Sequence, residues 1–162
     1  MMQTIDTGTE DLLAYLQDGV LTLTLNRPDA RNAMSGAMTT ALGEQLADAE
    51  LNSAVRCVVL TGAGKGFCAG GDVKGMAASG DGTVGDNTID AAIHRQRLNQ
   101  RATAGKLYSM PKPTIAALPG AAAGAGLSLA LACDMRVMAS TAIMTTAFAR
   151  VGFSGDYGGT FF

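Results

Sequence analysis

The sequence predicts an α/β fold, and three observations lead to that class. Apolar residues alternate with polar ones in some segments and recur every three or four residues in others, so predicted strands and helices are interspersed along the chain. Two glycine-rich stretches each follow an apolar run that is typical of a buried strand. The chain has 162 residues, a length typical of one domain. We therefore expect a single α/β domain over residues 1–162.

The N-terminal elements begin with a predicted β-hairpin. Asp18-Gly19 separates two apolar runs, and both of its positions tolerate the positive φ of a type I′ turn. Beyond Pro28 the apolar spacing changes to three and four residues, which is typical of an amphipathic helix. The predicted elements are strands at 12–17 and 20–25, a helix from about Ser35 to Glu50, and a strand at 55–61.

The second half repeats the order of strand, loop and helix. The stretch at 62–71 holds five glycines in ten residues, too many for a regular element. The elements that follow are a mobile surface stretch at 78–87, a helix at 89–108, a strand at 114–118, a second Gly/Ala loop at 120–126, a helix at 127–133 and a strand at 135–139. Backbone N–H groups exposed where a strand turns into a helix form an anion site, so each loop could hold a phosphate or a developing oxyanion.

Composition excludes several classes of function. Twelve Lys and Arg residues stand against fourteen Asp and Glu, and the net charge of −2 provides no basic field for nucleic acid or an anionic membrane. A small anionic ligand is still compatible with this balance. Three scattered cysteines and a single histidine, His94, support neither a disulfide framework nor a zinc site. We expect no metal, and a reduced, cytoplasmic protein without a signal peptide.

One uncharged segment has two interpretations. Residues 113–133 carry no charge, a length that suggests a membrane span. Their Ala and Gly content and the interruption at Pro119 favour a buried strand, turn and helix instead. We therefore expect no membrane insertion.

Two stretches of the sequence nearly match common catalytic motifs, but each lacks a required residue. The first loop contains Gly64-Lys65-Gly66, but a P-loop requires Ser or Thr after the lysine. The stretch Gly126-Leu127-Ser128-Leu129-Ala130 nearly matches the nucleophile elbow GxSxG, yet the only histidine lies in a predicted amphipathic helix. Nucleotide hydrolysis and a serine triad are therefore both disfavoured.

Three longer strings carry a family resemblance. They are NRPDARNAM at 26–34, VVLTGAGKGFCAGGDVKGM at 58–76 and KPTIAALPGAAAGAGLSLALACDMRVMA at 112–139. Together, and in this order, they resemble the enoyl-CoA hydratase/isomerase family, also called the crotonase family. The resemblance implies a spiral of strand-strand-helix turns, an acyl-CoA thioester as substrate, no cofactor besides the coenzyme A that the substrate carries, and homotrimers or dimers of trimers.

The resemblance also implies an oxyanion hole in the two glycine loops. The family stabilises a thioester enolate with two backbone N–H groups, which by position are those of Gly71 and Ala125. Preorganised donors of this kind are worth about 2.7–4 kcal/mol each, and small residues let the thioester approach the backbone. The alternative is that these loops are only tight turns.

A further group matches the family positions that line coenzyme A. These residues are Arg27, Ala30, Ala69, Gly70, Asp72 and Val73, with Lys74 as a candidate phosphate contact. Arg27 considered alone is equally compatible with an ordinary surface charge.

The catalytic carboxylates depart from the hydratase pattern. Hydratases of the family carry two glutamates, and the corresponding positions here are Ser128 and Phe148, neither of which can act as a general base. Asp156 instead matches the position of the catalytic aspartate of the family's double-bond isomerases and its aryl-CoA dehalogenase. The alternative is that Asp156 only caps a helix beginning near Tyr157. Ser128 and Tyr157 are secondary candidates for orienting substrate or water.

We therefore expect an enoyl- or dienoyl-CoA isomerase with Asp156 as its acid/base. The alternatives are a hydratase that activates water through another group, and a non-catalytic CoA-binding homologue. The resemblance also implies a further helical region after Phe162, so we expect a chain truncated at its C-terminus, and one that is insoluble, inactive or partner-dependent without that region.

Overall fold

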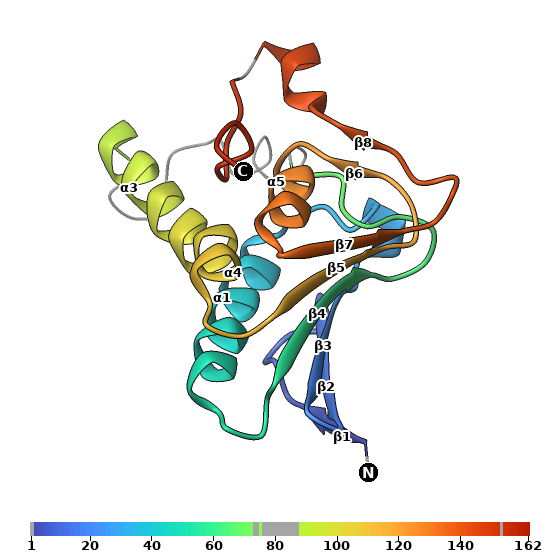
Figure 1. Ribbon diagram of the computed structural model, residues 1–162. Coiled ribbons are helices and arrows are strands. Elements are labelled where there is room, and N and C mark those ends of the chain that lie inside the picture. The colour runs from blue at the N-terminus through green and yellow to red at the C-terminus, as the bar shows by residue number, and fades with distance from the viewer. Residues whose placement is uncertain (1, 73–74, 76–87, 153) are drawn as a thin grey trace.

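The computed structural model describes residues 2–72, 75, 88–152 and 154–162, and its centre is a six-stranded mixed sheet (Figure 1). The strands follow the order β1-β2-β3-β4-β5-β7. Their bounds are β1 Gln3–Ile5, β2 Leu12–Gln17, β3 Val20–Leu25, β4 Cys57–Gly62, β5 Thr114–Leu118 and β7 Met135–Met138. Strand β2 pairs antiparallel with both β1 and β3. The strands from β3 to β7 in the sheet order are parallel to one another.

The predicted hairpin is confirmed. Strands β2 and β3 pair from Leu12↔Leu25 to Gln17↔Val20, and the turn between them places Asp18 at φ 52° and Gly19 at φ 85°. Both values are positive, as a type I′ turn requires. Strand β1, which the hydrophobic pattern did not predict, extends the hairpin by pairing with β2.

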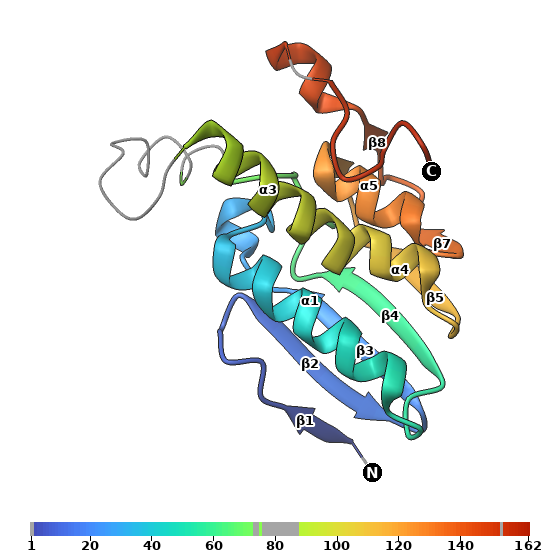
Figure 2. The same cartoon turned by 90° about the vertical axis from the view of Figure 1, so that its left-hand side faces the viewer.

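One face of the sheet carries the core. Leucines at alternate positions of β3 stand beside Val58 and Leu60 of β4 in the parallel register, and all are buried. Helix α1 (Gly36–Leu51) lies across this face (Figure 2), and it buries Met38, Leu42 and Leu46 against the strands. The Ser35 hydroxyl caps this helix by accepting a hydrogen bond from the Met38 amide at 3.1 Å.

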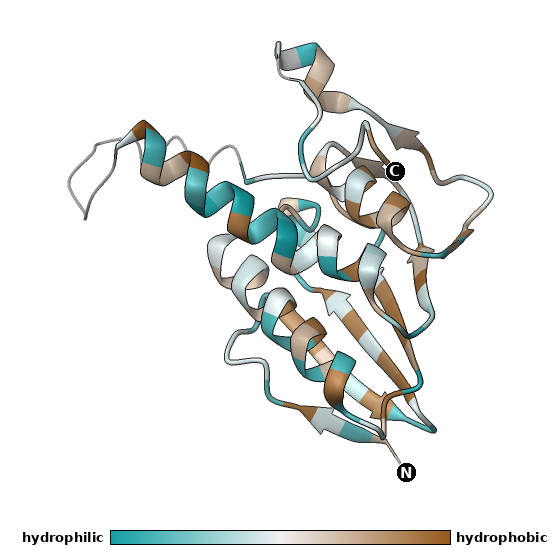
Figure 3. Cartoon of the chain, turned by 60° about the vertical axis from the view of Figure 1, so that its left-hand side comes forward, coloured by the Kyte–Doolittle hydropathy of each residue, from teal (hydrophilic) through white to brown (hydrophobic). Residues whose placement is uncertain are grey.

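The helix predicted at 89–108 is divided into three pieces. They are α3 (Ile89–Gln100), the π-helix η2 (Arg101–Gly105) and α4 (Lys106–Ser109). The Thr103 hydroxyl donates to the Asn99 carbonyl at 2.7 Å, the i−4 bond by which Thr side chains bend helices. The resulting wide turn lies against α1, while α3 extends outward and is mostly hydrophilic (Figure 3).

The C-terminal part contains short elements around helix α5 (Ala125–Ala132). Strands β6 (Ala122–Ala123) and β8 (Met144–Thr145) form a separate two-stranded sheet, and the 3-10 helices are η1 (Pro28–Ala30) and η3 (Ala147–Val151). The uncharged segment 113–133 forms β5, β6 and α5, and no helix among the described residues is long and apolar enough to cross a membrane.

No helix begins at Tyr157 itself, where the prediction placed one, among the residues that the structure describes. Tyr157 has φ 50° and Gly158 has φ 79°, and two consecutive left-handed residues cannot continue a right-handed helix. They form a turn closed by the Gly159 amide, which donates to the Asp156 carbonyl at 3.0 Å. The Gly158 carbonyl then accepts from the Phe161 and Phe162 amides at 2.8 and 3.0 Å, so the first helix-like turn comes after Asp156 and Tyr157.

Candidate active site

The two glycine loops lie directly against each other. A β-bridge joins Cys68 of the first loop to Ala122 of the second, and the Ala123 amide donates to the Cys68 carbonyl at 2.9 Å. A Cβ on Gly126 would overlap the Cys68 carbonyl oxygen and lie 2.6 Å from the Cys68 Cβ. Only a residue without a side chain allows this approach.

The predicted oxyanion donors come from these adjoining loops. Ala125 is the first residue of α5, and its N-cap Gly124 has φ 54° and supplies no side-chain cap. A Cβ on Gly70, the neighbour of Gly71, would lie 3.3 Å from the Ala125 nitrogen. Within the described ranges, neither the Gly71 nor the Ala125 amide donates a hydrogen bond. Two uncommitted N–H groups are therefore available on neighbouring loops.

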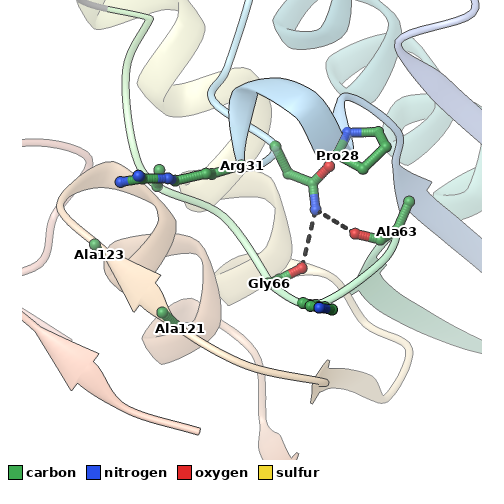
Figure 4. Close-up of a pocket in the computed structure, with 9 residues that line it drawn as sticks. Pro28, Arg31, Ala63, Gly66, Ala121 and Ala123 are labelled. Atoms are coloured by element: carbon green, nitrogen blue, oxygen red, sulfur yellow. Dashed lines mark hydrogen bonds between the residues drawn. The ribbon is translucent and has the colours of Figure 1, made fainter.

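A buried asparagine holds the first loop in shape (Figure 4). The Asn32 side-chain amide donates to the Ala63 and Gly66 carbonyls, each at 2.9 Å, and its oxygen accepts from the Arg27 amide at 2.9 Å. Asn32 is fully buried and has φ 55°, in the left-handed region that asparagine tolerates better than most residues. The loop conformation thus depends on a residue that the sequence analysis did not single out.

A cavity of about 360 Å³ opens beside this loop. Its lining consists of Pro28, Arg31, Asn32, Ala63, Lys65, Gly66, Ala69, Ala121 and Ala123. Arg31 and Lys65 bring two positive charges to a small-residue surface that both glycine loops share (Figure 4). Neither residue was predicted as a binding residue, although both lie inside the strings that carry the family resemblance. A cation beside loop amides is a signal for an anionic ligand.

The structure describes five of the seven residues predicted to contact coenzyme A. Ala69 lines the cavity, Gly70 lies next to the Ala125 amide, and Ala30 ends the 3-10 helix η1. Arg27 and Asp72 form an ion pair with each other at 2.9 Å. Val73 and Lys74, like the surface stretch at 78–87, lie outside the described residues.

Asp156 is held next to α5 by a serine. The buried Ser128 hydroxyl donates to the Asp156 carbonyl at 2.8 Å, and Ser128 is one helical turn beyond Ala125. A Cβ on Gly159 would collide with the same hydroxyl, so this turn packs closely on the helix. The arrangement brings the Asp156 segment to the helix end that contains the candidate oxyanion donor.

Burial sets the protonation of the three titratable groups around this turn. It raises the pKa of Asp156 above its usual 3.8, with a hydrogen bond to its own backbone opposing the effect. Burial, and then the charge of Asp156, raise the pKa of Tyr157 to about 12, while a hydrogen bond with Thr39 acts in the opposite direction. Burial also raises the pKa of the Cys68 thiol to about 11. Tyr157 and Cys68 are therefore neutral at pH 7, and Cys68 is no thiolate nucleophile.

No group of three or more His, Cys, Asp or Glu side chains that could hold a metal ion is found among the residues described.

Comparison with known proteins shows what this arrangement is. The sequence profile of enoyl-CoA hydratase/isomerase matches residues 16–162. The chain belongs to this family. It is 39% identical over 151 residues to 1,2-epoxyphenylacetyl-CoA isomerase of Escherichia coli, a match that covers 93% of this chain and 56% of that protein. It is 38% identical over 149 residues to human enoyl-CoA hydratase domain-containing protein 2, mitochondrial, covering 91% of this chain and 48% of that protein.

Solved structures confirm the crotonase fold. The crystal structure of an enoyl-CoA hydratase from a Polaromonas species matches with a TM-score of 0.80 and 38% identity, covering 92% of this chain and 56% of that one. An enoyl-CoA hydratase from Bacillus anthracis matches with a TM-score of 0.79 and 31% identity, covering 93% and 56%. The chain thus spans about half the length of the family members it matches.

The two positions where the resemblance places the glutamates of hydratases contain side chains without a carboxylate. The Ser128 hydroxyl is engaged by the Asp156 carbonyl. Phe148 lies in η3, and a Cβ on Gly155 would be 3.3 Å from its ring. Both side chains therefore pack against the segment around Asp156, and neither can act as a general base.

Proposed function

We propose that this member of the family is an acyl-CoA double-bond isomerase in which Asp156 transfers the proton. The observation that carries the proposal is the hydrogen bond from Ser128 to the Asp156 carbonyl at 2.8 Å, because it ties the carboxylate segment to the first turns of α5. The Ala125 amide lies at the start of the same helix.

The chemistry needs one carboxylate and two amide donors. The Asp156 carboxylate takes a proton from C2 of a 3-enoyl-CoA, and the electron pair moves onto the thioester oxygen to give a dienolate. The Gly71 and Ala125 N–H groups stabilise that oxyanion. The carboxylic acid then returns the proton to C4, which yields the 2-enoyl-CoA and regenerates the carboxylate.

The raised pKa of Asp156 supports this role. A carboxylate that is partly desolvated is a stronger base than one in water, and its conjugate acid is ready to return the proton. One relative is an isomerase of an acyl-CoA by name, 1,2-epoxyphenylacetyl-CoA isomerase, whereas another has a hydratase name.

The cavity beside the loops supports a coenzyme A ligand. We assign the anionic phosphates of the substrate to Arg31 and Lys65, which both line the cavity. We also propose the homotrimer typical of the family, a state that analytical ultracentrifugation of the chain can measure.

The test is a screen of 2-enoyl-, 3-enoyl- and aromatic CoA thioesters, with 1,2-epoxyphenylacetyl-CoA among them, in deuterated water. Mass spectrometry reports deuterium exchange, isomerisation and the mass of an added water in the same sample. We expect Asp156→Asn to lower turnover by about 10²–10⁴-fold, the range of general acid/base catalysis. The matched control is Asp48→Asn on the exposed side of α1, with unchanged turnover.

Three results would contradict the proposal. Undiminished isomerisation by Asp156→Asn would exclude the Asp156 mechanism. Addition of water as the main product would identify a hydratase. Binding of CoA that raises the melting temperature, without turnover of any thioester, would identify a non-catalytic binding protein.

A further inference from the structure

A half-buried arginine reaches from the end of β3 to the loop that contains Gly71. The Arg27 Nη1 atom donates to the Asp72 Oδ2 atom at 2.9 Å and to the Ala33 carbonyl at 2.7 Å. The side chains of Arg27 and Asp72 are 24% and 22% exposed, so this ion pair is largely shielded from water. One guanidinium therefore links the residue after Gly71 to the segment before helix α1.

The same segment holds the loop through its backbone. The Met34 amide donates to the Gly70 carbonyl at 2.8 Å, and the Asp72 amide donates to the Met34 carbonyl at 3.3 Å. These two bonds form the β-bridge between Met34 and Gly71. In a bridge of this pattern the middle residue directs its own N–H away from the partner strand. The bridge therefore sets the direction of the Gly71 amide.

We propose that Arg27 is a positioning residue that keeps this bridge closed, and so keeps the Gly71 N–H aimed at the thioester oxygen. The proposal rests on the proposed function for the identity of that oxygen. Gly70 and Gly71 have no side chains to pack, and Gly70 has φ 99°, so the loop depends on contacts made by its neighbours. Arg27 holds Ala33 on one side of the bridge and Asp72 on the other.

The charges around Arg27 favour this role over direct contact with a phosphate. A second carboxylate, Asp11, lies 3.6 Å from the Arg27 Nε atom and also accepts a hydrogen bond from the Ser35 hydroxyl. Two carboxylates thus already face the one guanidinium of Arg27, and a phosphate would have to compete with them for it. Arg31 and Lys65, which line the cavity, have no ion pair with a described carboxylate.

Two variants and one control separate the two roles. Arg27→Met removes the guanidinium and keeps much of the apolar stem, and Asp72→Asn removes the charge of its partner with little change in shape. Arg56→Met is the matched control, because Arg56 donates to the Asp18 carbonyl at the hairpin turn. Each variant is measured for amide hydrogen exchange at Met34 and Asp72 without ligand, for the affinity of CoA, and for the carbonyl stretch of bound ¹³C-labelled butyryl-CoA.

A positioning role gives one pattern of results. In Arg27→Met and Asp72→Asn, exchange at the Met34 and Asp72 amides rises by about tenfold or more, since a charge-assisted hydrogen bond is lost. The thioester carbonyl stretch moves back toward its value in solution, and the affinity for CoA changes by less than about threefold. The control leaves all three readings unchanged.

A phosphate contact gives the opposite pattern and would overturn the proposal. Arg27→Met would then weaken CoA binding by about tenfold or more, while amide exchange and the carbonyl stretch stay at their wild-type values. Unchanged exchange in both variants would also overturn it. If the wild-type chain binds no acyl-CoA, the proposed function fails, and the exchange measurement still decides whether Arg27 holds the bridge.

Discussion

The two glycine loops meet at one site but are held there in different ways. The first loop is fastened by polar side chains from outside it, with Asn32 at its start and Arg27 at its end. The second loop is held by backbone hydrogen bonds to the first. Gly120 and Gly126 have no side chains, which lets the two backbones approach closely. A Cβ at Gly120 would overlap the Lys65 carbonyl oxygen.

Because of this difference, substitutions in the two loops are expected to have different effects. A change in the side chains that hold the first loop can loosen it while the surrounding core stays packed. A change at a contact glycine of the second loop forces two backbones apart, because a carbonyl oxygen cannot move aside as a flexible side chain can. We therefore expect a larger loss of stability from a methyl group at a contact glycine than from the loss of a side chain that holds the first loop.

Gly126→Ala is expected to have the largest effect. The new methyl group would overlap the Cys68 carbonyl and lie 2.6 Å from its Cβ, so the two loops would have to separate. We expect a loss of about 3 kcal/mol in the free energy of unfolding. Urea titration followed by circular dichroism measures it, since the chain contains no tryptophan. Gly66→Ala is the control, because nothing lies within 4 Å of a Cβ there. Equal stability of the two variants would refute the steric account.

Asn32→Ala is expected to cost about 2 kcal/mol. The change leaves the Ala63 and Gly66 carbonyls without their side-chain donor, and an unsatisfied buried polar group costs about 1–3 kcal/mol. Asn32→Asp tests the donors specifically, since it keeps the shape and the acceptor for the Arg27 amide. If Asn32→Asp is as stable as wild type in calorimetry, the two donated bonds do not hold the loop.

Ser128→Ala is expected to cost about 1 kcal/mol, the net value of one hydrogen bond. The Ser128 hydroxyl is the link between α5 and the Asp156 carbonyl, so we also expect lower turnover with an unchanged KM. Ser109→Ala is the control, because the exposed Ser109 hydroxyl donates to the Gly105 carbonyl within its own helical segment. A Ser128→Ala variant with wild-type turnover would show that this link does not orient the carboxylate.

Ionisation of Asp156 is expected to have the smallest effect on stability. Because burial raises its pKa in the folded chain, the folded state binds this proton more tightly than the unfolded state. The free energy of unfolding therefore falls as the pH rises above about 4 through the folded pKa. Urea titrations of wild type and Asp156→Asn across this range isolate the contribution of Asp156 as their difference. A difference that grows in favour of wild type with rising pH would contradict the sign.

Much of the local structure was predictable because it depends on patterns among residues that are close in the sequence. The alternation around Asp18-Gly19 predicted a hairpin whose turn has the expected positive φ values. The change to helical spacing after Ser35 predicted α1 almost to the residue. These signals survive folding because each depends on residues a few positions apart.

The errors lie where a tertiary contact competes with a local pattern. The helix predicted at 89–108 contains a π-turn, in which the Thr103 hydroxyl takes a backbone acceptor and Ala102 packs within 3.1 Å of where a Gly43 Cβ would be. The helix predicted near Tyr157 is replaced by a turn packed on Ser128. The packing of Ala102 on Gly43 and the bond from Ser128 to Asp156 join residues that are distant along the chain, so no short sequence pattern predicts them.

The sequence by itself determined the order of the elements, the two glycine loops and the carboxylate that follows them. Glycine content, periodicity and short motifs are local properties, so a sequence displays them without reference to distant residues. The tertiary structure alone decided that Cys68 brings the two loops together, that Asn32 shapes the first of them, and that Arg27 faces Asp72. Those pairings depend on the directions in which side chains leave elements far apart in the sequence, and only the packed sheet and helices set those directions.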